Sequence, residues 1–374
     1  MLNKPRILTV VRPAEGGIRA HIKTLVQELH EDFSFSVACP PEQSADFKEY
    51  GCEVVPVPMR AAVHPVHDLR ALLQMHKNLK NGSYSLVHAH GFKAALLARP
   101  VAGYSHIPCL VTVHGDFAHA ASSPLGPVYR RAEAAFAGWA TGYITVADWL
   151  AEELQAVYSV DGKRIAVIPN GIRFPAFPQA GNAKAVLPFS SADVVIGTVA
   201  RLAPQKGIEY FIEAAALLSK TNPDLRFVVV GDGPQRRVLE LLSRNLGLTD
   251  KLYFAGAQQN VADFLAGFTV FVQPSISEGQ GITALEAMAA GCPVVASAVG
   301  GLRELIRHGD NGLLVPPGEP QALAGAVNRL LGDELLRASL TGQGLTVARR
   351  YSVAEMVNRT RALYAQIVEG RWPA

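Results

Sequence analysis

The chain has 374 residues, of which 49% are hydrophobic and 18% charged, and this length exceeds what one ordinary hydrophobic core organises. The 35 Lys and Arg residues against 32 Asp and Glu residues leave a formal net charge of +3, which argues against the clustered basic surface of a nucleic-acid-binding protein. We therefore expect two domains and no nucleic-acid partner. Weak docking to an anionic membrane is left open.

The cysteines and the N-terminal segment bound the class of protein further. Cys39, Cys52, Cys109 and Cys292 form no CxxC pair, so we expect buried, reduced thiols rather than a zinc site or a disulfide framework. Met1–Val11 lacks the apolar core of a signal peptide, and no stretch approaches the roughly 20 apolar residues of a membrane span. These features predict a cytoplasmic protein, associated at most peripherally with the inner face of a membrane.

The first half alternates short β-branched runs with helical periodicity. A strand is predicted at Ile7–Val11, and apolar residues at helical spacing then predict a helix that ends at Leu29. Strands that alternate with helices form a parallel sheet, because a crossover must return the chain to the same edge. The other predicted strands are 35–38, 54–57, 86–89, 110–113, 143–146 and 165–168, with helices that include 68–79 and 147–158.

A segment rich in Pro, Gly and Asn, Pro169–Pro188, separates this series from a second one and is typical of a linker. We predict a first domain over 1–178, a linker over 179–189, a second domain over 190–352, and a C-terminal segment 353–374 that packs back on the first domain. Parallel sheets bind ligands at the carboxyl ends of their strands, so a cleft shared by both domains is expected to hold the site. The predicted strands of the second domain are 194–199, 227–230, 252–254, 270–273, 293–296 and 312–315.

The most informative stretch is Ser275–Val295. Gly279, Gln280 and Gly281 predict a turn that opens a helix from about Ile282 to Ala290. Because a helix N-terminus combines unpaired N–H donors with the positive end of the helix dipole, it favours a phosphate group.

Two carboxylates flank that turn. Glu278 lies before it and Glu286 about one turn inside the helix, so they are expected to contact different parts of one ligand. Glu286 could accept hydrogen bonds from a ribose diol, and Glu278 from hydroxyl groups of a second, sugar-like group. The alternative is a pair of ordinary solvated residues. It is disfavoured for Glu286, which lies among Ala284, Leu285, Ala287 and Met288 and needs a partner there.

Here the sequence resembles the GT-B glycosyltransferases, specifically glycosyltransferase family 4, whose pattern is two glutamates separated by seven residues. Glu278 and Glu286 enclose seven residues, and the following positions also resemble the family. The resemblance implies two Rossmann-like, doubly wound domains facing a central cleft. It also implies a retaining, metal-independent transfer from a nucleoside diphosphate sugar, with UDP as our expectation, to a hydroxyl acceptor in glycan or glycolipid synthesis. The donor is a substrate, and no cofactor is expected.

Further roles follow from the resemblance. Arg201 and Lys206, in a loop after the first strand of the second domain, are expected to neutralise the donor diphosphate as it leaves. Gly16 and Gly17, which open the first helix, would let the backbone approach the donor phosphates and the acceptor. The alternatives are two solvated cations and a simple tight turn.

Ten of the eleven histidines precede residue 120. His114, followed by Gly115 and Asp116, resembles the family's His-Gly step and is expected to face the donor sugar near its anomeric carbon. His88 and His90, which we expect to follow a strand, are predicted to be structural, and metal binding by these histidines is a minor alternative.

The remaining donor-site residues are also assigned by resemblance. The Gly-Asp-Gly sequence that begins at Gly231 and the loop that begins at Gly256 would lie near the nucleotide base. Ile282 would lie at the phosphate-binding turn. Gln280 departs from the family, which commonly has an aromatic residue there. This departure leaves the shape of the donor pocket open.

The residues do not include a clear carboxylate nucleophile, so we expect a front-face route in which the departing diphosphate takes the acceptor's proton. Two other functions are compatible with a sugar-nucleotide site. A sugar-nucleotide epimerase would need proton-transfer groups, for which the first-domain histidines are the only supply, and a non-catalytic sensor would bind the donor without turnover.

Overall fold

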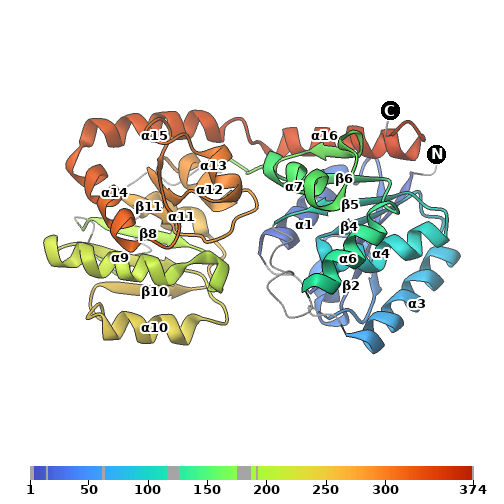
Figure 1. Ribbon diagram of the computed structural model, residues 1–374, viewed down its shortest axis with the longest axis horizontal. Coiled ribbons are helices and arrows are strands. Elements are labelled where there is room, and N and C mark those ends of the chain that lie inside the picture. Colours follow the sequence, from blue (N-terminus) through green and yellow to red (C-terminus); the bar gives the residue numbers. More distant parts are fainter. Residues whose placement is uncertain are drawn as a thin grey trace. The chain divides into compact units, whose positions relative to one another are not determined.

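The computed structural model describes residues 4–13, 16–60, 64–115, 126–174, 187–190 and 193–372. The chain divides into two compact units, Met1–Asn170 with Val353–Ala374 (unit 1) and Gly171–Ser352 (unit 2) (Figure 1). This division lies before the predicted linker 179–189, most of which is outside the described residues. The physical reason is that the Ile172 N–H donates to the Tyr351 carbonyl oxygen at 2.8 Å and Ile172 forms a bridge with Ser352, which ties this segment to unit 2.

Unit 1 contains a seven-stranded parallel sheet in the order β3-β2-β1-β4-β5-β6-β7. Its chain order reverses between β1 and β4. Its strands are β1 (Arg6–Val11), β2 (Ser34–Cys39), β3 (Glu53–Pro56), β4 (Leu86–His90), β5 (Cys109–Val113), β6 (Gly142–Thr145) and β7 (Ile165–Val167). Its helices include α1 (Gly17–Leu29), α2 (Ser44–Lys48), α3 (Pro65–Asn81), α4 (Phe92–Tyr104), α6 (Gly126–Ala137), α7 (Asp148–Tyr158) and α16 (Val353–Val368).

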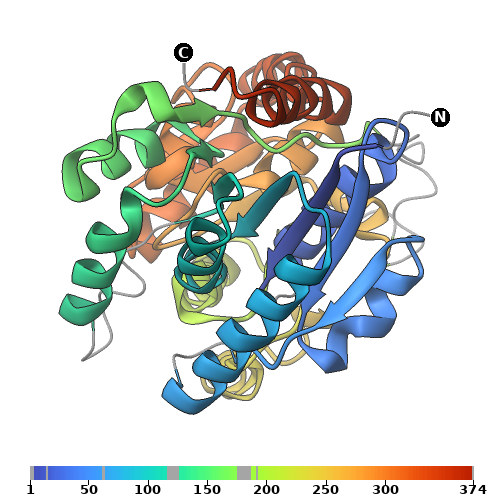
Figure 2. The same ribbon diagram turned by 90° about the vertical axis from the view of Figure 1, so that its right-hand side faces the viewer.

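Alternate residues of these strands enter two separate cores, because successive side chains of a strand point to opposite faces. Ile7 and Leu86 lie in the core that α1 and α16 cover, whereas Leu8 and Val87 lie in the core on the other face, beneath helices that include α3, α4 and α7. Figure 2 shows helices on both faces of this sheet. The strands therefore read as continuous apolar runs, as expected for a parallel sheet buried on both sides.

Unit 2 contains a six-stranded parallel sheet in the order β10-β9-β8-β11-β12-β13, again with helices on both faces. Its chain order reverses between β8 and β11. The strands are β8 (Val195–Val199), β9 (Arg226–Val230), β10 (Leu252–Gly256), β11 (Val270–Gln273), β12 (Val294–Ser297) and β13 (Leu313–Val315). The helices include α9 (Ile208–Thr221), α10 (Arg236–Asn245), α11 (Val261–Gly267), α12 (Ile282–Ala289), α13 (Gly300–Leu305), α14 (Pro320–Gly332) and α15 (Glu334–Ala348).

These two sheets confirm the predicted fold class of two doubly wound α/β domains. Each predicted strand is present, with ends that differ by at most one or two residues. The last helix, α16, belongs to unit 1, where Tyr364 is fully buried and Arg361 pairs with Asp32 at 2.8 Å.

Two predictions on composition can be compared with the structure. All four cysteines are free thiols, but Cys52 is only partly buried and donates to the Phe47 carbonyl oxygen at 3.0 Å, whereas the other three are buried as predicted. Among helices within the described residues, none combines the length and the apolar character that crossing a membrane requires.

Candidate active site

The predicted donor-site residues of unit 2 gather at the carboxyl edge of its sheet. The loop with Arg201 and Lys206 follows β8, and the turn that contains Gly279 follows β11. These two strands are neighbours at the point where the chain order reverses, so both segments border it. Ligands of open α/β sheets bind at such a switch point. The parallel arrangement therefore brings together residues that are more than 70 positions apart.

Lys206 and Glu278 form an ion pair. The Lys206 Nζ lies 2.7 Å from the Glu278 Oε2, which also accepts from the Gln273 Nε2 at 2.8 Å and the Ser275 Oγ at 3.1 Å. The two loops are joined by the backbone as well, because the Ile276 N–H donates to the Gln205 carbonyl oxygen at 2.9 Å. Lys206 and Glu278 retain 24% and 11% side-chain exposure, so a ligand can still reach the pair.

Helix α12 begins beside this pair, as the glycine turn predicted. Gly281 has a φ of 92°, and a Cβ atom there would lie 2.6 Å from the Leu302 side chain. A Cβ atom on Gly301 would lie 2.4 Å from the Gly279 carbonyl oxygen, so the α13 backbone packs directly on the turn. The N-cap residue of α12 is Gly281, which has no side chain to cap the helix, and Ile282 is the first helical residue. An anion site at this helix N-terminus stays a prediction.

Glu286 and Gln280 are less accessible than ordinary polar residues. Glu286 lies one turn into α12, and burial raises the pKa of its carboxyl group to about 7. No hydrogen bond or ion pair joins this carboxylate to another of the described residues, so burial is the cause of the shift. Gln280, at the position where the family commonly has an aromatic residue, is 6% exposed.

The Gly231 turn packs against the loop that carries Arg201. Gly231 has a φ of 129°, and a Cβ atom there would lie 1.9 Å from the Ala200 carbonyl oxygen, which only glycine avoids. Its N–H donates to the Gly256 carbonyl oxygen at 2.8 Å, so both predicted base-side glycines lie together. Arg201 itself is exposed and takes no part in the Lys206–Glu278 pair.

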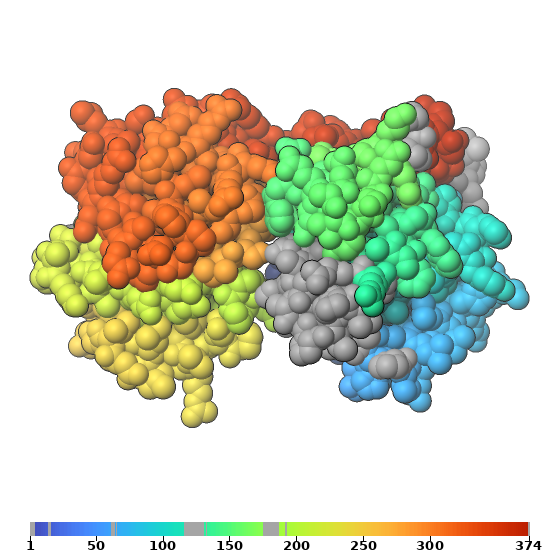
Figure 3. Space-filling model, viewed as in Figure 1, coloured from blue at the N-terminus to red at the C-terminus, as the bar shows by residue number. Residues whose placement is uncertain are grey.

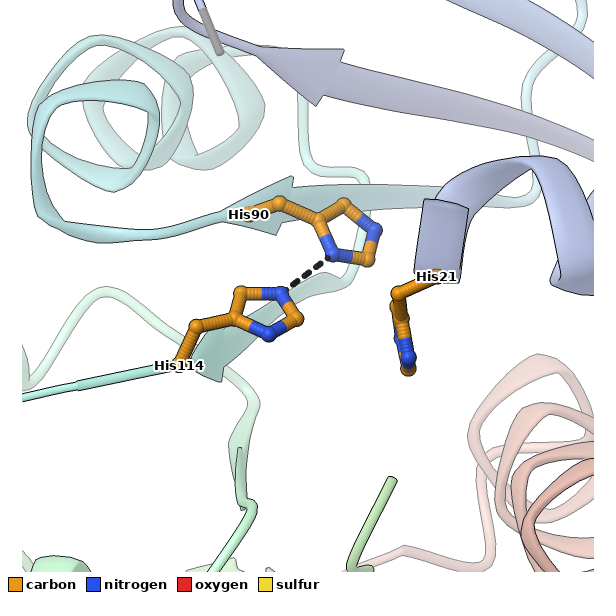
Figure 4. A group of neighbouring side chains, drawn as sticks. All are labelled: His21, His90 and His114. Carbon is orange, nitrogen blue, oxygen red and sulfur yellow. Dashed lines mark hydrogen bonds between the residues drawn. The ribbon is translucent and has the colours of Figure 1, made fainter. Parts of the chain in front are cut away.

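In unit 1, three histidines meet at the carboxyl edge of the sheet (Figure 4). His90 ends β4, His114 follows β5, and His21 lies in the second turn of α1; Gly16, with a φ of 69°, caps that helix and Gly17 is its first residue. The His90 Nδ1 lies 3.1 Å from the His114 Nε2, and the His21 ring centroid lies 5.0 Å from that of His114. Asp116 lies outside the described residues.

His21 was not among the site residues predicted from the sequence. The signal was available, because α1 starts directly after the β1 edge and its first turns must lie near the ends of β4 and β5. The prediction that His88 and His90 follow a strand is wrong, because both lie inside β4, on the same face. His88 fits the predicted structural role: its Nδ1 lies 2.5 Å from the Tyr364 Oη of α16, and its Nε2 lies 2.7 Å from the Thr112 Oγ1.

Burial favours the neutral form of His21, His88, His90 and His114. Burial lowers the pKa of His21 to about 4 and that of His88 to about 3, and it holds the pKa of His90 and His114 well below the usual value. The neighbouring histidines lower these pKa values further, because two adjacent imidazolium groups would repel each other. His114 can therefore donate or accept a hydrogen bond but carries no charge. Its Nε2 is engaged by His90, so its Nδ1 is the nitrogen left for a ligand.

The same three histidines could hold a metal ion, because one ligand atom from each lies within 4.8 Å of the others. Imidazole ligands lie about 2.0–2.1 Å from zinc, so two ligand atoms on one ion are at most about 4.2 Å apart. The His90 Nδ1 and the His114 Nε2 are 3.1 Å apart, within this limit, so their spacing fits either a hydrogen bond or two ligands of one ion. Metal independence stays a prediction.

Comparisons with known proteins agree with this arrangement. The family described as "Glycosyltransferase Family 4" matches residues 15–174, and that described as "Glycosyl transferases group 1" matches residues 181–345. A D-inositol 3-phosphate glycosyltransferase of Acidothermus cellulolyticus is 30% identical over 337 residues, which cover 83% of this chain and 73% of the relative. The UDP-Gal:alpha-D-GlcNAc-diphosphoundecaprenol alpha-1,3-galactosyltransferase of Escherichia coli is 29% identical over 312 residues, 81% of each chain.

A solved structure has the same fold. The Anabaena protein HepE in complex with UDP and glucose superposes with a TM-score of 0.85 at 20% identity, over 97% of this chain and 100% of that one. This likeness confirms the two Rossmann-like domains. With the family matches and the relatives, it shows that the chain belongs to glycosyltransferase family 4, has the GT-B fold and is a glycosyltransferase.

Proposed function

We propose that this enzyme transfers a sugar from a UDP-linked donor to a hydroxyl group of a glycan or glycolipid, with retention of the anomeric configuration. The observation that carries the proposal is the Lys206–Glu278 pair beside the uncapped N-terminus of α12. This arrangement offers a cation and N–H donors to a diphosphate and a carboxylate to hydroxyl groups. The UDP complex of HepE and the UDP-galactose named for the E. coli relative support the choice of nucleotide.

Within this proposal, unit 2 binds the donor. The diphosphate accepts from the first N–H groups of α12, around Gly279, Gly281 and Ile282, and Lys206 and Arg201 neutralise its charge. Glu286 accepts from the ribose diol, and Glu278 from hydroxyl groups of the sugar. The turns at Gly231 and Gly256 lie beside the base, and the buried Gln280 shapes the pocket.

The proposed reaction needs no protein nucleophile. The bond between the anomeric carbon and the diphosphate oxygen breaks, and the acceptor oxygen bonds to the same face of that carbon. The acceptor's proton passes to the departing diphosphate oxygen, so charge and atoms balance. Neutral His114 hydrogen-bonds the donor sugar through its Nδ1, and the backbone at Gly16 and Gly17 approaches the phosphates. The protein thus contributes positioning and stabilisation of the leaving group.

An assay of UDP-sugars with lipid-linked and free glycan acceptors tests the proposal, with the anomeric configuration of the product read by NMR. We expect a product with the configuration of the donor, and an inverted product would contradict retention. Release of a changed or free sugar without transfer would favour an epimerase. Tight donor binding with no turnover on any acceptor would favour a sensor.

Metal independence is tested in the same assay. We expect turnover to be unchanged after treatment with a chelator, because Lys206, Arg201 and the α12 N–H groups supply the positive charge that a metal ion would otherwise provide. Loss of turnover that magnesium restores would show that a metal ion is required.

Donor affinity should depend on pH through Glu286. Its pKa of about 7 means that the carboxylate is ionised above pH 7 and protonated below it. A protonated carboxyl group accepts fewer hydrogen bonds from a diol, so we expect UDP affinity to fall by up to about tenfold per pH unit below pH 7. Titration calorimetry across this range measures the effect.

The variant Glu286→Gln should bind UDP more weakly at pH 8 and show a flatter pH profile. Without ligand it should be more stable than the wild type above pH 7, because the raised pKa means that ionisation favours the unfolded state from about pH 4.5 up to pH 7. Glu334→Gln on α15, where the side chain is 88% exposed, is the control. An unchanged UDP affinity and profile in Glu286→Gln would contradict the ribose assignment.

The acceptor of the E. coli relative carries diphosphoundecaprenol, so a lipid-linked acceptor is part of the proposal. The cytoplasmic location expected from the sequence stays a prediction.

A further inference from the structure

The ring of His90 is hydrogen-bonded to the ring of His114 at the carboxyl edge of the unit 1 sheet (Figure 4). The His90 Nδ1 lies 3.1 Å from the His114 Nε2, so these two nitrogens share one hydrogen atom. Either ring can be the donor, because a neutral imidazole carries its proton on one of its two nitrogens. The direction of this hydrogen bond therefore decides whether the His114 Nδ1 donates to a ligand or accepts from it.

Packing fixes the orientation of the His90 ring. His90 is 0% exposed, and its ring centroid lies 4.1 Å from that of His88, on the same face of β4. His88 is itself held by hydrogen bonds with the Tyr364 Oη and the Thr112 Oγ1. From the other side, the ring of His21 on α1 lies edge-on to His90, with the two centroids 5.5 Å apart. These contacts hold His90 in one place while a ligand binds nearby.

His90 and His114 differ in their access to ligands. His90 points to the face of the sheet on which it meets His21 of α1, and its neighbour His88 meets Tyr364 of α16. The opposite face is covered by helices that include α3 and α7, which form part of the surface in Figure 3 in blue and green. His114 follows its strand and is only partly buried. A ligand at the carboxyl edge can therefore contact His114, whereas His90 acts on it only through His114.

The second ring nitrogen of His90 indicates the direction of the hydrogen bond. The His90 Nε2 is buried and has no hydrogen-bond partner among the described residues. If His90 accepted from His114, its own proton would lie on Nε2, as a buried N–H group without an acceptor. Such N–H groups are rare in folded proteins, and buried acceptors without a donor are somewhat less so. A doubly protonated ring is disfavoured, because burial and the neighbouring histidines hold the pKa of His90 well below its usual value.

We propose that His90 is a positioning residue whose Nδ1–H donates to the His114 Nε2 and fixes His114 in the tautomer with its proton on Nδ1. This inference rests on the proposed function and deepens it, because it makes His114 a hydrogen-bond donor to an oxygen atom of the donor sugar. In this tautomer the one lone pair of the His114 ring is occupied by His90. His114 therefore does not act as a general base toward the acceptor, which leaves the departing diphosphate to take the acceptor's proton.

The tautomer can be measured without any substrate. Long-range ¹H–¹⁵N correlation spectra of the full chain, labelled with ¹⁵N-histidine and treated with a chelator, report which ring nitrogen carries the proton. The loss of a signal in His114→Asn assigns that histidine. We expect the His114 proton on Nδ1 in the wild type, and a shift toward Nε2 in His90→Leu, where nothing donates to that nitrogen. A proton on the His114 Nε2 in the wild type would overturn the proposal.

Two variants of His90 separate a hydrogen bond from simple packing. His90→Leu should lower kcat for sugar transfer by about tenfold or more, because His114 is no longer held in the productive form. His90→Asn should recover most of this loss, since its amide N–H lies close to the position of the Nδ1–H. A purely structural role predicts the opposite order, because Leu suits a buried apolar site better than Asn. Activity in His90→Leu equal to that of the wild type, or lower activity in His90→Asn than in His90→Leu, would contradict the proposal.

The control is His30→Leu, at an exposed histidine after α1, which should keep full activity. Tryptophan fluorescence checks the fold of each variant, because all three tryptophans belong to unit 1. If the His90 variants do not fold, the wild-type spectrum decides the outcome by itself.

UDP binding distinguishes this inference from the proposed function. We expect UDP to bind the wild type and both His90 variants equally, since UDP carries no sugar and the proposed donor-site residues that hold it lie in unit 2. A wild type that neither binds UDP nor transfers sugar, but has the His114 proton on Nδ1, would contradict the proposed function and leave the tautomer assignment standing. Normal transfer with the proton on Nε2 would contradict only the inference.

Discussion

Replacing Lys206 with Ala should lower kcat by about 100-fold or more, because the departing diphosphate loses a positioned cation at the moment its charge develops. An interaction that strengthens as the leaving-group charge develops should lower kcat and kcat/KM together, and UDP, which carries that charge in full, should also bind more weakly. Steady-state kinetics with a saturating acceptor, together with UDP titration, measures both quantities. Arg201→Ala should also lower kcat. Because the Arg201 side chain is exposed, we expect this variant to fold normally.

The contact between Lys206 and Glu278 makes a sharper test possible. Glu278 keeps its hydrogen bonds from Gln273 and Ser275 when Lys206 is removed, so the carboxylate remains in place. Lys251→Ala, a half-buried lysine at the opposite edge of the same sheet, is the matched control and should keep full activity. Unchanged turnover in both Lys206→Ala and Arg201→Ala would refute the assignment of the diphosphate site.

The second large effect is on the stability of unit 1. Arg99 and Glu133 are 0% and 1% exposed, and their ion pair joins α4 to α6. The Arg99 Nη1 donates to the Glu133 Oε1 at 2.6 Å and to the Tyr143 Oη at 3.1 Å. Glu133→Gln leaves a buried guanidinium without its counter-charge and should lower the free energy of unfolding by about 3–5 kcal/mol.

Urea unfolding followed by tryptophan fluorescence measures this loss selectively, because Trp139, Trp149 and Trp372 all belong to unit 1. The double variant Arg99→Met/Glu133→Met should recover most of the stability, since buried pairs are often replaced by apolar residues at little cost. Glu369→Gln, which removes an exposed pair with Arg371, should change stability by less than about 1 kcal/mol. A loss in Glu133→Gln no larger than in this control would contradict the role of the pair.

The sequence by itself determined the order and type of the elements. Both faces of each strand are buried, so strands such as Val270–Gln273 are unbroken apolar runs, and the glycines before Ile282 mark the start of α12. The two glutamates that enclose seven residues identified the family and the turn where a phosphate could bind. These signals are local, because periodicity and backbone freedom act over a few residues.

Only the tertiary structure decided which distant side chains meet. Sheet order is set by crossovers and packing, and it brought Lys206 to Glu278 while leaving Arg201 outside that pair. It also joined His21 to His90 and His114, and burial there made the histidines neutral. The exposure of Leu69 and Leu73 on α3 (Pro65–Asn81) was hidden for the same reason. A run such as Leu69, Ala71, Leu73 and Met75 does not reveal which of its sides faces the core until the helix is packed on its sheet.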